Sequence, residues 1–197
     1  MNGRLYDIAL SPFERFSLRE LRADLLKNAR GRTLEIGFGT GLNLPHYPHE
    51  VALVAVDPDP EMLSQAKEKA AAGKKKVDLT EASAEKLPFE AEAFDTVVAT
   101  LVFCSVKEPK AALGEIVRVL KPGGRALLLE HIRYERGMAA GKVQDFLTPL
   151  WMRIAGGCHL NRNPEPYFES LDFNVERAQS LWFGFGKLWV LQKRCKK

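Results

Sequence analysis

The feature that most constrains this chain is a set of three glycines at every second position, directly after a short apolar run. The segment Thr33–Tyr47 reads TLEIGFGTGLNLPHY, so glycine occupies positions 37, 39 and 41. Glycine lacks Cβ, and a backbone built from it can turn tightly and lie directly against a ligand. Ligands of open α/β sheets bind beyond the carboxyl ends of the strands. We therefore expect this bend to contact a ligand.

Strand-like and helix-like segments alternate on both sides of the glycines. Strands are predicted over residues 32–37, 51–57, 76–83, 93–103 and 125–132, and a helix is predicted over 109–120. A further helix begins after Asp59, which suits the N-cap, with Pro60 in its first turn and Gly73 at its C′ position. This alternation is typical of a parallel sheet with helices on both faces.

The two ends of the chain follow other patterns. Residues 1–30 predict an amphipathic helix, and residues 136–170 look irregular. Segments 173–181 and 187–194, joined by WFGFG, predict an antiparallel hairpin. The expected fold class is α/β: a Rossmann-like, doubly wound, mostly parallel seven-stranded sheet with a C-terminal antiparallel hairpin and an N-terminal helical lid.

Composition and charge argue against several classes of protein. A chain of 197 residues that is 46% hydrophobic fits one globular domain. We find no signal-peptide pattern and no apolar run near the ~18 residues that cross a bilayer, and we expect a cytoplasmic protein. The net charge of +4 is dense only in GKKK and QKRCKK. Those runs predict a solvated turn and tail, or attraction to anionic lipid, and no nucleic-acid partner is expected.

The cysteines give no sign of a metal centre. Cys104, Cys158 and Cys195 form no CxxC pair, so we expect neither a zinc site nor a disulfide framework. The odd number suits a reducing compartment.

An acidic residue narrows the identity of the ligand. Asp57 ends the second predicted strand, 20 residues after Gly37, where a carboxylate can accept hydrogen bonds from ribose hydroxyls. A dinucleotide fingerprint would need a third glycine where Leu42 or Leu44 stands. The pattern E-x-G-x-G-x-G therefore indicates an adenosine-containing ligand other than a dinucleotide.

This pattern resembles motif I of the class I S-adenosylmethionine-dependent methyltransferases, of the type 11 group. The resemblance extends through SAEKLPF, FDTVVA and EIVRVLKPGGRALLLE, and covers roughly residues 30–132. It implies a single methyltransferase domain, divided into a helical lid (1–30), a cofactor-binding core (31–135), an acceptor-side insertion (136–170) and a strand hairpin (171–197). The implied cofactor is S-adenosyl-L-methionine, with S-adenosyl-L-homocysteine as its product.

The resemblance also implies roles by position. Glu35 and the backbone of Gly37, Gly39 and Gly41 line the methionine end of the cofactor, and Asp57 holds the ribose. The other implied contacts are Pro58 and Met62 flanking the adenine, Ser83 and Ala84 at its edge, and Thr100 and Leu101 beside the sulfonium. Ser83 replaces the family's usual aspartate, and Met62 also fits simple core packing.

Narrower similarities concern the methyl acceptor. LVFCSVKEP, LLLEHI and GGCHLNRN resemble thiol S-methyltransferase-like proteins, whereas YDIALSPF and GFGTGLNLPHY resemble bacterial phospholipid N-methyltransferases. The second resemblance implies that Tyr6 covers the cofactor. The expected acceptor is a small, rather apolar molecule or a lipid. Peripheral membrane contact through the N-terminal helix and a monomer or weak dimer are also expected.

The chemistry does not oblige the protein to supply a base. The methyl carbon of a sulfonium is already electrophilic, so alignment and a dry pocket do most of the work. A base is needed only for an acceptor that arrives protonated, and a thiol needs less help than a hydroxyl. The candidate bases are His46, Glu130, His131 and His159, each of which also fits a structural role. A cofactor-binding protein without turnover and an NAD(P)-dependent oxidoreductase of similar fold are the alternatives.

Overall fold

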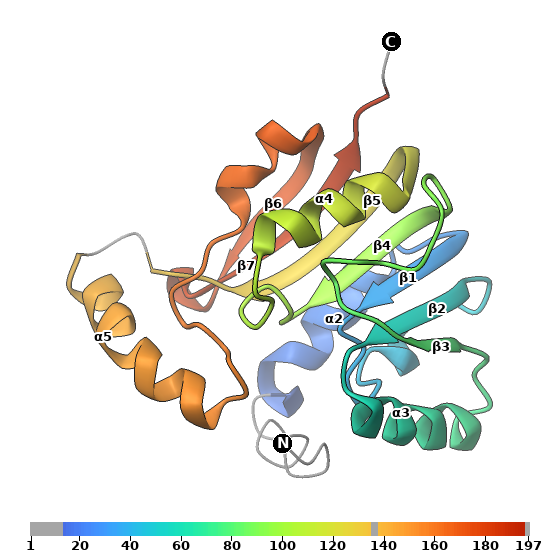
Figure 1. Cartoon of the computed structure of the whole chain (residues 1–197), viewed down its shortest axis with the longest axis horizontal. Coiled ribbons are helices and arrows are strands. Elements are labelled where there is room, and N and C mark those ends of the chain that lie inside the picture. The colour runs from blue at the N-terminus through green and yellow to red at the C-terminus, as the bar shows by residue number, and fades with distance from the viewer. Residues whose placement is uncertain (1–13, 135–137, 196–197) are drawn as a thin grey trace.

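The computed structural model describes residues 14–134 and 138–195, and a seven-stranded sheet forms its centre (Figure 1). The strands are β1 (Arg32–Ile36), β2 (Ala52–Asp57), β3 (Asp78–Glu81), β4 (Phe94–Thr100), β5 (Leu120–His131), β6 (Phe173–Leu181) and β7 (Gly186–Lys193). The helices are α2 (Arg19–Leu26), α3 (Pro60–Ala72), α4 (Pro109–Val119) and α5 (Met138–Ile154). Short helical turns are η1 (Glu14–Leu18), η2 (Leu44–His46), η3 (Glu165–Tyr167), η4 (Glu169–Leu171) and η5 (Trp182–Gly184).

The strand order is β3-β2-β1-β4-β5-β7-β6, which confirms the predicted sheet. β1 to β5 pair in parallel, whereas β7 runs antiparallel to both β5 and β6. The chain winds outward from β1 to β3 and then returns to place β4 on the other side of β1. The point where the order reverses therefore lies between β1 and β4, where doubly wound sheets bind their ligands.

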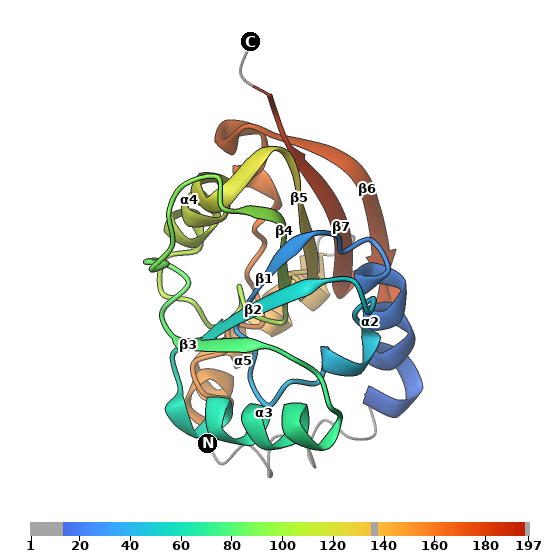
Figure 2. The same cartoon turned by 90° about the vertical axis from the view of Figure 1, so that its right-hand side faces the viewer.

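Helices cover the two faces of the sheet separately (Figure 2). Side chains alternate between the faces along each strand, so Val97 packs in the cluster that contains α4, and Val98 packs with α2 and α3. Ala66 of α3 and Leu25 of α2 belong to one core, and Ile116 of α4 belongs to the other. Two apolar layers on one sheet thus hold the ends of the strands in place.

The first turn of α3 follows the sequence prediction, and its last turn differs by one residue. Asp59 caps the helix, because its Oδ1 accepts hydrogen bonds from the backbone N–H of Glu61 at 2.9 Å and of Met62 at 3.4 Å. Gly73, expected at C′, is the C-cap with φ −83°, and Lys74 takes the left-handed conformation with φ +52°. The amide of Lys75 closes this turn onto the carbonyl of Ala70 at 3.0 Å, the bond of a Schellman motif.

The prediction of an irregular segment over residues 136–170 is wrong for residues 138–154. These residues form α5, which lies at one end of the molecule beyond β5 and β7 (Figure 1). Gly141 and Pro149 lie inside the helix and are signals that normally argue against one. The fifth strand also begins earlier than expected, at Leu120, so the glycines of KPGG lie within it.

The amphipathic N-terminal helix is confirmed over residues 14–26. Leu18, Leu25 and Leu26 are fully buried in the core that α3 shares. Tyr6 and the rest of residues 1–13 lie outside the described residues. Within the described residues, the structure holds no helix that is both long enough and apolar enough to span a bilayer.

Candidate functional site

Three glycines form the bend that follows β1, and each has a positive φ. The angles are +64° at Gly37, +56° at Gly39 and +82° at Gly41. A Cβ on Gly37 would lie 2.5 Å from Cγ2 of Val102, and one on Gly41 would lie 3.3 Å from the ring of Phe38. A Cβ on Gly39 would meet no atom within 4 Å. Gly37 and Gly41 therefore allow close packing, whereas Gly39 presents bare backbone to open space.

Asp57 lies against this bend, as the sequence predicts. Its Oδ2 accepts a hydrogen bond of 2.7 Å from the N–H of Gly39, and its Oδ1 accepts one of 2.9 Å from the N–H of Asp59. Burial raises the pKa of the Asp57 carboxyl, and the two backbone bonds partly offset that effect. Because a carboxylate has about four lone-pair sites, Asp57 keeps capacity for ligand hydroxyls at the end of β2.

Glu35 lies beneath the bend and is held by protein groups on both oxygens. Asn43 donates to its Oε1 at 2.8 Å, and the hydroxyl of Tyr47 donates to its Oε2 at 2.7 Å. Only 1% of the residue is exposed, and burial raises its pKa to about 7 despite these bonds. In this arrangement Glu35 braces the bend, and its predicted role beside the methionine end stays a prediction.

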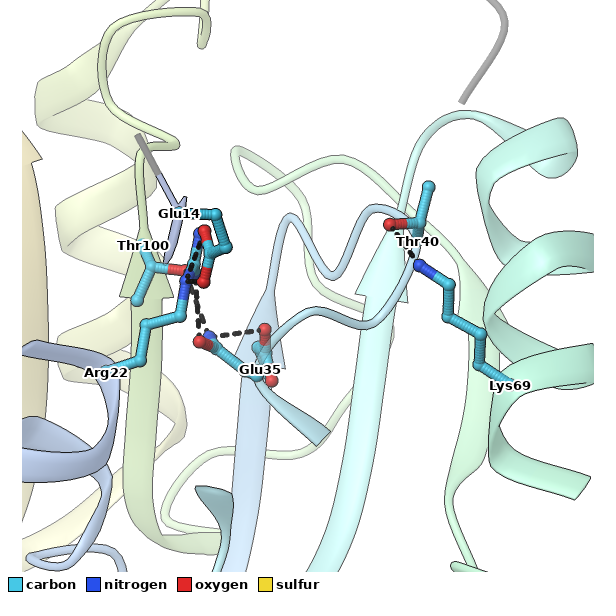
Figure 3. A network of polar contacts seen from close by, with 7 residues as sticks. Glu14, Arg22, Glu35, Thr40, Lys69 and Thr100 are labelled. Atoms are coloured by element: carbon cyan, nitrogen blue, oxygen red, sulfur yellow. Dashed lines mark hydrogen bonds and ion pairs between the residues drawn. The ribbon is translucent and has the colours of Figure 1, made fainter. Parts of the chain in front are cut away.

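Arg22 of α2 ties the bend to the end of β4 (Figure 3). Its Nη1 donates to Asn43 Oδ1 at 2.8 Å and to Thr100 Oγ1 at 2.9 Å, and its Nε pairs with Glu14 at 2.9 Å. The residue is 3% exposed, so its charge is neutralised inside the protein by this network. The sequence analysis did not identify Arg22, Asn43 or Tyr47 as site residues. Asn43 and Tyr47 lie two and six positions after Gly41, and this proximity to the glycines is the signal that could have identified them.

A second brace joins the bend to α3. Lys69 donates to Thr40 Oγ1 at 3.0 Å on the opposite side of the bend from Arg22 (Figure 3). The glycine bend is thus held from α2 on one side and from α3 on the other.

Thr100 and Leu101 close β4 beside the bend. The Thr100 hydroxyl accepts bonds from Arg22 and from Asn43, the second at 2.9 Å. Leu101 has φ +58°, a conformation that costs a leucine of order 1–3 kcal/mol, and its N–H donates to the carbonyl of Leu129 at 2.8 Å. Strained backbone of this kind occurs often at ligand sites.

The residues expected around an adenine lie at the same edge of the sheet. Pro58 is exposed and Met62 is half-buried in the first turn of α3, so Met62 is not committed to the core. Ala84 is buried, and Ser83 is exposed with its hydroxyl bonded to Glu85. The amide of Ala82 donates to the Asp57 carbonyl at 3.2 Å, which holds this loop beside β2.

The candidate bases divide into two groups. His46 lies in η2, where burial and the charge of Arg22 lower its pKa. Glu130 and His131 end β5, and His159 belongs to the loop that follows α5. Glu130 is fully buried, its Oε1 accepts bonds from the amides of Val102 at 2.8 Å and Phe103 at 3.2 Å, and burial raises its pKa to about 7.

His131 and His159 meet two cysteines rather than open solvent. His131 Nε2 lies 3.2 Å from Cys158 Sγ, and hydrogen bonding from Cys104, joined by that from His131, lowers the pKa of the Cys158 thiol against the effect of burial. His159 Nδ1 lies 3.0 Å from the Cys104 carbonyl oxygen and Nε2 lies 3.3 Å from Arg162 Nη2. No local sequence motif predicts the contact between the thiols of Cys104 and Cys158, because 54 positions separate them.

Comparisons with known proteins give the family. Residues 34–128 match the family model described as a methyltransferase domain. The chain is 37% identical over 157 residues to thiol S-methyltransferase TMT1B of Rattus norvegicus, covering 72% of this chain and 59% of the relative. It is 38% identical over 139 residues to phosphatidylethanolamine N-methyltransferase of Cereibacter sphaeroides, covering 69% of this chain and 68% of that one. The chain belongs to the S-adenosylmethionine-dependent methyltransferases.

Solved structures agree with this family in fold. A SAM-dependent methyltransferase of Methanosarcina mazei, 20% identical, superposes with a TM-score of 0.66 over 84% of this chain and 93% of that chain. The YcgJ protein of Bacillus subtilis, 18% identical, gives a TM-score of 0.71 over 90% of this chain and 98% of that chain.

The residues of this methyltransferase fit its cofactor, S-adenosylmethionine. Gly39 offers bare backbone with free space above it, and Asp57 lies beside it with lone pairs available for ribose hydroxyls. Leu101 brings the end of β4 to the same edge. These three features would hold the donor at the point where the strand order reverses.

Proposed function

We propose that this methyltransferase transfers the methyl group of S-adenosylmethionine to a small, rather apolar acceptor, and that the acceptor is a thiol in preference to an amine or a hydroxyl. The proposal rests on the hydrogen bond from the Gly39 N–H to Asp57 at the carboxyl edge of the sheet. The thiol preference draws support from the rat relative, which is a thiol S-methyltransferase.

The contacts and burial of the candidate bases also favour a thiol acceptor. Both ring nitrogens of His159 contact protein groups, His131 contacts Cys158, and Glu130 has no exposed surface. His46 lies on the other side of the site, close to Arg22. A hydroxyl acceptor needs a strong, accessible base, whereas a thiol ionises near pH 8.5 and needs little help.

The protein's own contribution is positional. Bound S-adenosylmethionine supplies a methyl carbon that is electrophilic without further activation. Asp57 and the bare backbone at Gly39 would orient the donor, and the braces from Arg22 and Lys69 keep the bend in one conformation. Buried apolar residues of β4 and β5 would limit the access of water to the reacting atoms.

Turnover of labelled S-adenosylmethionine with matched acceptors tests this proposal. The rate of methyl transfer should be highest for an alkyl thiol and lower for the corresponding amine and the corresponding alcohol. Binding of the donor without transfer to any acceptor would support a cofactor-binding protein instead. Stabilisation by NADH and not by S-adenosylhomocysteine would support the oxidoreductase alternative.

We also propose that the acceptor reaches the site from a membrane surface, through the exposed face of α5. Six apolar side chains of α5 follow helical spacing and are exposed to solvent by between 41% and 83%: Val143, Phe146, Leu147, Leu150, Trp151 and Ile154. Exposed Lys142 and Arg153 lie on the same helix, an arrangement that suits anionic lipid. Trp151 also contacts Cys158, so this face adjoins the acceptor side of the site.

We propose this surface as the point of lipid contact in preference to the described part of the N-terminal helix, and contact through residues 1–13 stays a prediction. Over residues 14–26 the apolar side chains Leu18, Leu25 and Leu26 are buried in the core, so they are not free to enter a bilayer. The phosphatidylethanolamine N-methyltransferase relative is consistent with a lipid or a lipid-dissolved acceptor. A monomer or weak dimer in the cytoplasm stays a prediction.

Co-sedimentation with vesicles that contain phosphatidylglycerol tests the α5 surface. The double variant Phe146→Glu, Leu150→Glu should lose binding, and Val175→Glu, which changes an exposed apolar residue on β6, should retain it. A stable dimer that dissociates in the α5 variant, together with no vesicle binding by the unaltered chain, would show that a second copy covers this face.

A further inference from the structure

Three side chains that can ligate a metal converge beside the end of β4. Cys104 Sγ, a ring nitrogen of His131 and Cys158 Sγ all lie within 4.8 Å of one another. A zinc ion bonded to sulfur at about 2.3 Å and to nitrogen at about 2.0 Å would hold its ligands roughly 3.5–3.8 Å apart. The existing spacing therefore needs only small side-chain movements to admit an ion.

The backbone around these side chains is held in place by independent contacts. The amide of His159 donates to the carbonyl of Cys104 at 2.8 Å, and the Arg162 guanidinium donates to the carbonyl of Phe103 at 3.0 Å. Gln144 of α5 donates to the carbonyl of Leu160 at 3.0 Å. The loop that carries Cys158 is thus fixed against the loop that carries Cys104 by contacts that do not involve sulfur.

We propose that Cys104, His131 and Cys158 bind a zinc ion. Two thiolates and an imidazole form a ligand set that selects zinc over magnesium or calcium. This proposal departs from our expectation from the sequence, which rested on the missing CxxC pair. The ligands come from three separate segments of the chain, so no local spacing of residues predicts the site. Glu130 supplies a buried carboxyl directly beside the cluster, and its Oε2 has no hydrogen-bond partner among the described residues.

Three protein ligands leave the fourth position of a tetrahedral zinc open, as in catalytic sites. Cys104 Sγ lies 3.5 Å from the carbonyl oxygen of Leu101, so the three ligands adjoin the residue expected beside the sulfonium. This part of the inference rests on the proposed function. An acceptor thiol would bind the ion as thiolate and release its proton to solvent. Its sulfur would then form a bond to the methyl carbon while the donor's carbon–sulfur bond breaks, leaving that electron pair on the donor sulfur.

Metal content and zinc affinity test the site without reference to methyl transfer. Protein purified without a metal-affinity step should contain one zinc per chain by plasma mass spectrometry. In competition with a chromophoric chelator, Cys158→Ser should weaken zinc binding by at least about 100-fold. Cys195→Ser should bind zinc as the unaltered chain does, because Cys195 is exposed at the end of the hairpin. Thermal stabilisation of Cys158→Ser by S-adenosylhomocysteine would show that this variant is folded.

The opposite results are equally clear. Three results would each overturn the zinc site. The first is less than one zinc per chain after loading, and the second is equal zinc affinity in the two serine variants. The third is an intact mass two hydrogens lighter, because that would show that Cys104 and Cys158 form a disulfide. The open position has its own readout in the cobalt-substituted protein. Adding an alkyl thiol should strengthen the thiolate-to-cobalt absorption, and an unchanged spectrum would rule out acceptor binding to the ion. Calorimetry measures the binding of S-adenosylhomocysteine independently of zinc. It therefore distinguishes a failure of the zinc site from a failure of the proposed function.

Discussion

The three glycines after β1 look equivalent in the sequence, yet each meets a different constraint in the structure. All three have positive φ, but a side chain at Gly37 would overlap Val102, and one at Gly41 would press on Phe38. Gly39 alone faces open space. The spacing in the sequence predicted a ligand-binding bend, but only the packing of neighbouring loops distinguishes the glycine that faces the ligand from those that serve the fold.

Alanine at the two positions should therefore have different effects. Gly37→Ala combines a left-handed alanine with overlap against Val102, and should cost about 2–4 kcal/mol of unfolding free energy. Gly39→Ala should cost only about 1–2 kcal/mol and should weaken S-adenosylhomocysteine binding by about tenfold or more, equivalent to about 1.4 kcal/mol. Urea unfolding and calorimetry measure the two effects. Equal losses of stability with unchanged affinity would contradict the assignment of Gly39.

The buried carboxyl of Glu35 should make the free energy of unfolding depend on pH. Burial raises its pKa from the ordinary value of 4.5 to about 7. The folded state therefore holds this proton more tightly than the unfolded state, so the contribution of Glu35 is fully present below pH 4.5 and is lost as the pH rises through 7. The loss should be on the order of 3 kcal/mol.

The variant Glu35→Gln isolates this contribution. Glutamine can still accept from Asn43 and can donate to the hydroxyl oxygen of Tyr47, so both contacts survive without a titrating group. Urea unfolding at pH 5 and pH 8 should show a smaller difference for the variant than for the unaltered chain. An identical difference in both proteins would mean that Glu35 titrates normally.

At the scale of elements, α2 is more than a cover over the sheet. Arg22 reaches from this helix to Asn43 of the bend and Thr100 of β4, so the helix, the bend and the strand are held as one unit. Arg22→Ala would leave several buried polar groups without partners and should cost about 2–4 kcal/mol. Arg19→Ala, which removes an exposed arginine from the same helix, is the matched control and should stay within about 0.5 kcal/mol.

Thermal unfolding and calorimetry with S-adenosylhomocysteine measure this prediction. Arg22→Ala should also bind the ligand more weakly, because the bend loses one of its two braces. A variant that is as stable as Arg19→Ala and binds as tightly would show that α2 and the bend are independent.

Elements whose apolar residues are buried in the core were predictable, and the element with an exposed apolar face was not. β1 and β2 are nearly continuous apolar runs because both of their faces are buried, and α3 has one buried apolar face and the capping residues that the sequence predicts. α5 was missed because Gly141 and Pro149 interrupt it, and because its apolar residues such as Phe146 point to solvent. A helix whose apolar face is turned away from the core serves something other than the fold.

At the scale of the whole molecule, the sheet gathers residues that are distant in the sequence. Gly39 and Asp57 meet, and Leu101 follows β4 at the same edge, because parallel strands bring their carboxyl ends together. The sequence motifs were enough to predict that Asp57 lies beside the glycine bend. Cys104, His131 and Cys158 meet because the loop after α5 folds back over β4 and β5, and no motif encodes that path. Contacts set by regular topology are predictable from sequence, whereas contacts set by an irregular loop are not.

We predict that the bend and Asp57 together bind the methyl donor, and titration calorimetry with S-adenosylhomocysteine measures this binding. The unaltered chain should bind one equivalent. Asp57→Asn should weaken binding by about 10- to 100-fold, the effect of losing hydrogen bonds to a charged acceptor. Asp78→Asn, an exposed change at the start of β3, should leave it unaltered. No heat of binding for the unaltered chain, or equal affinity in both aspartate variants, would show that the bend and Asp57 do not form the donor site.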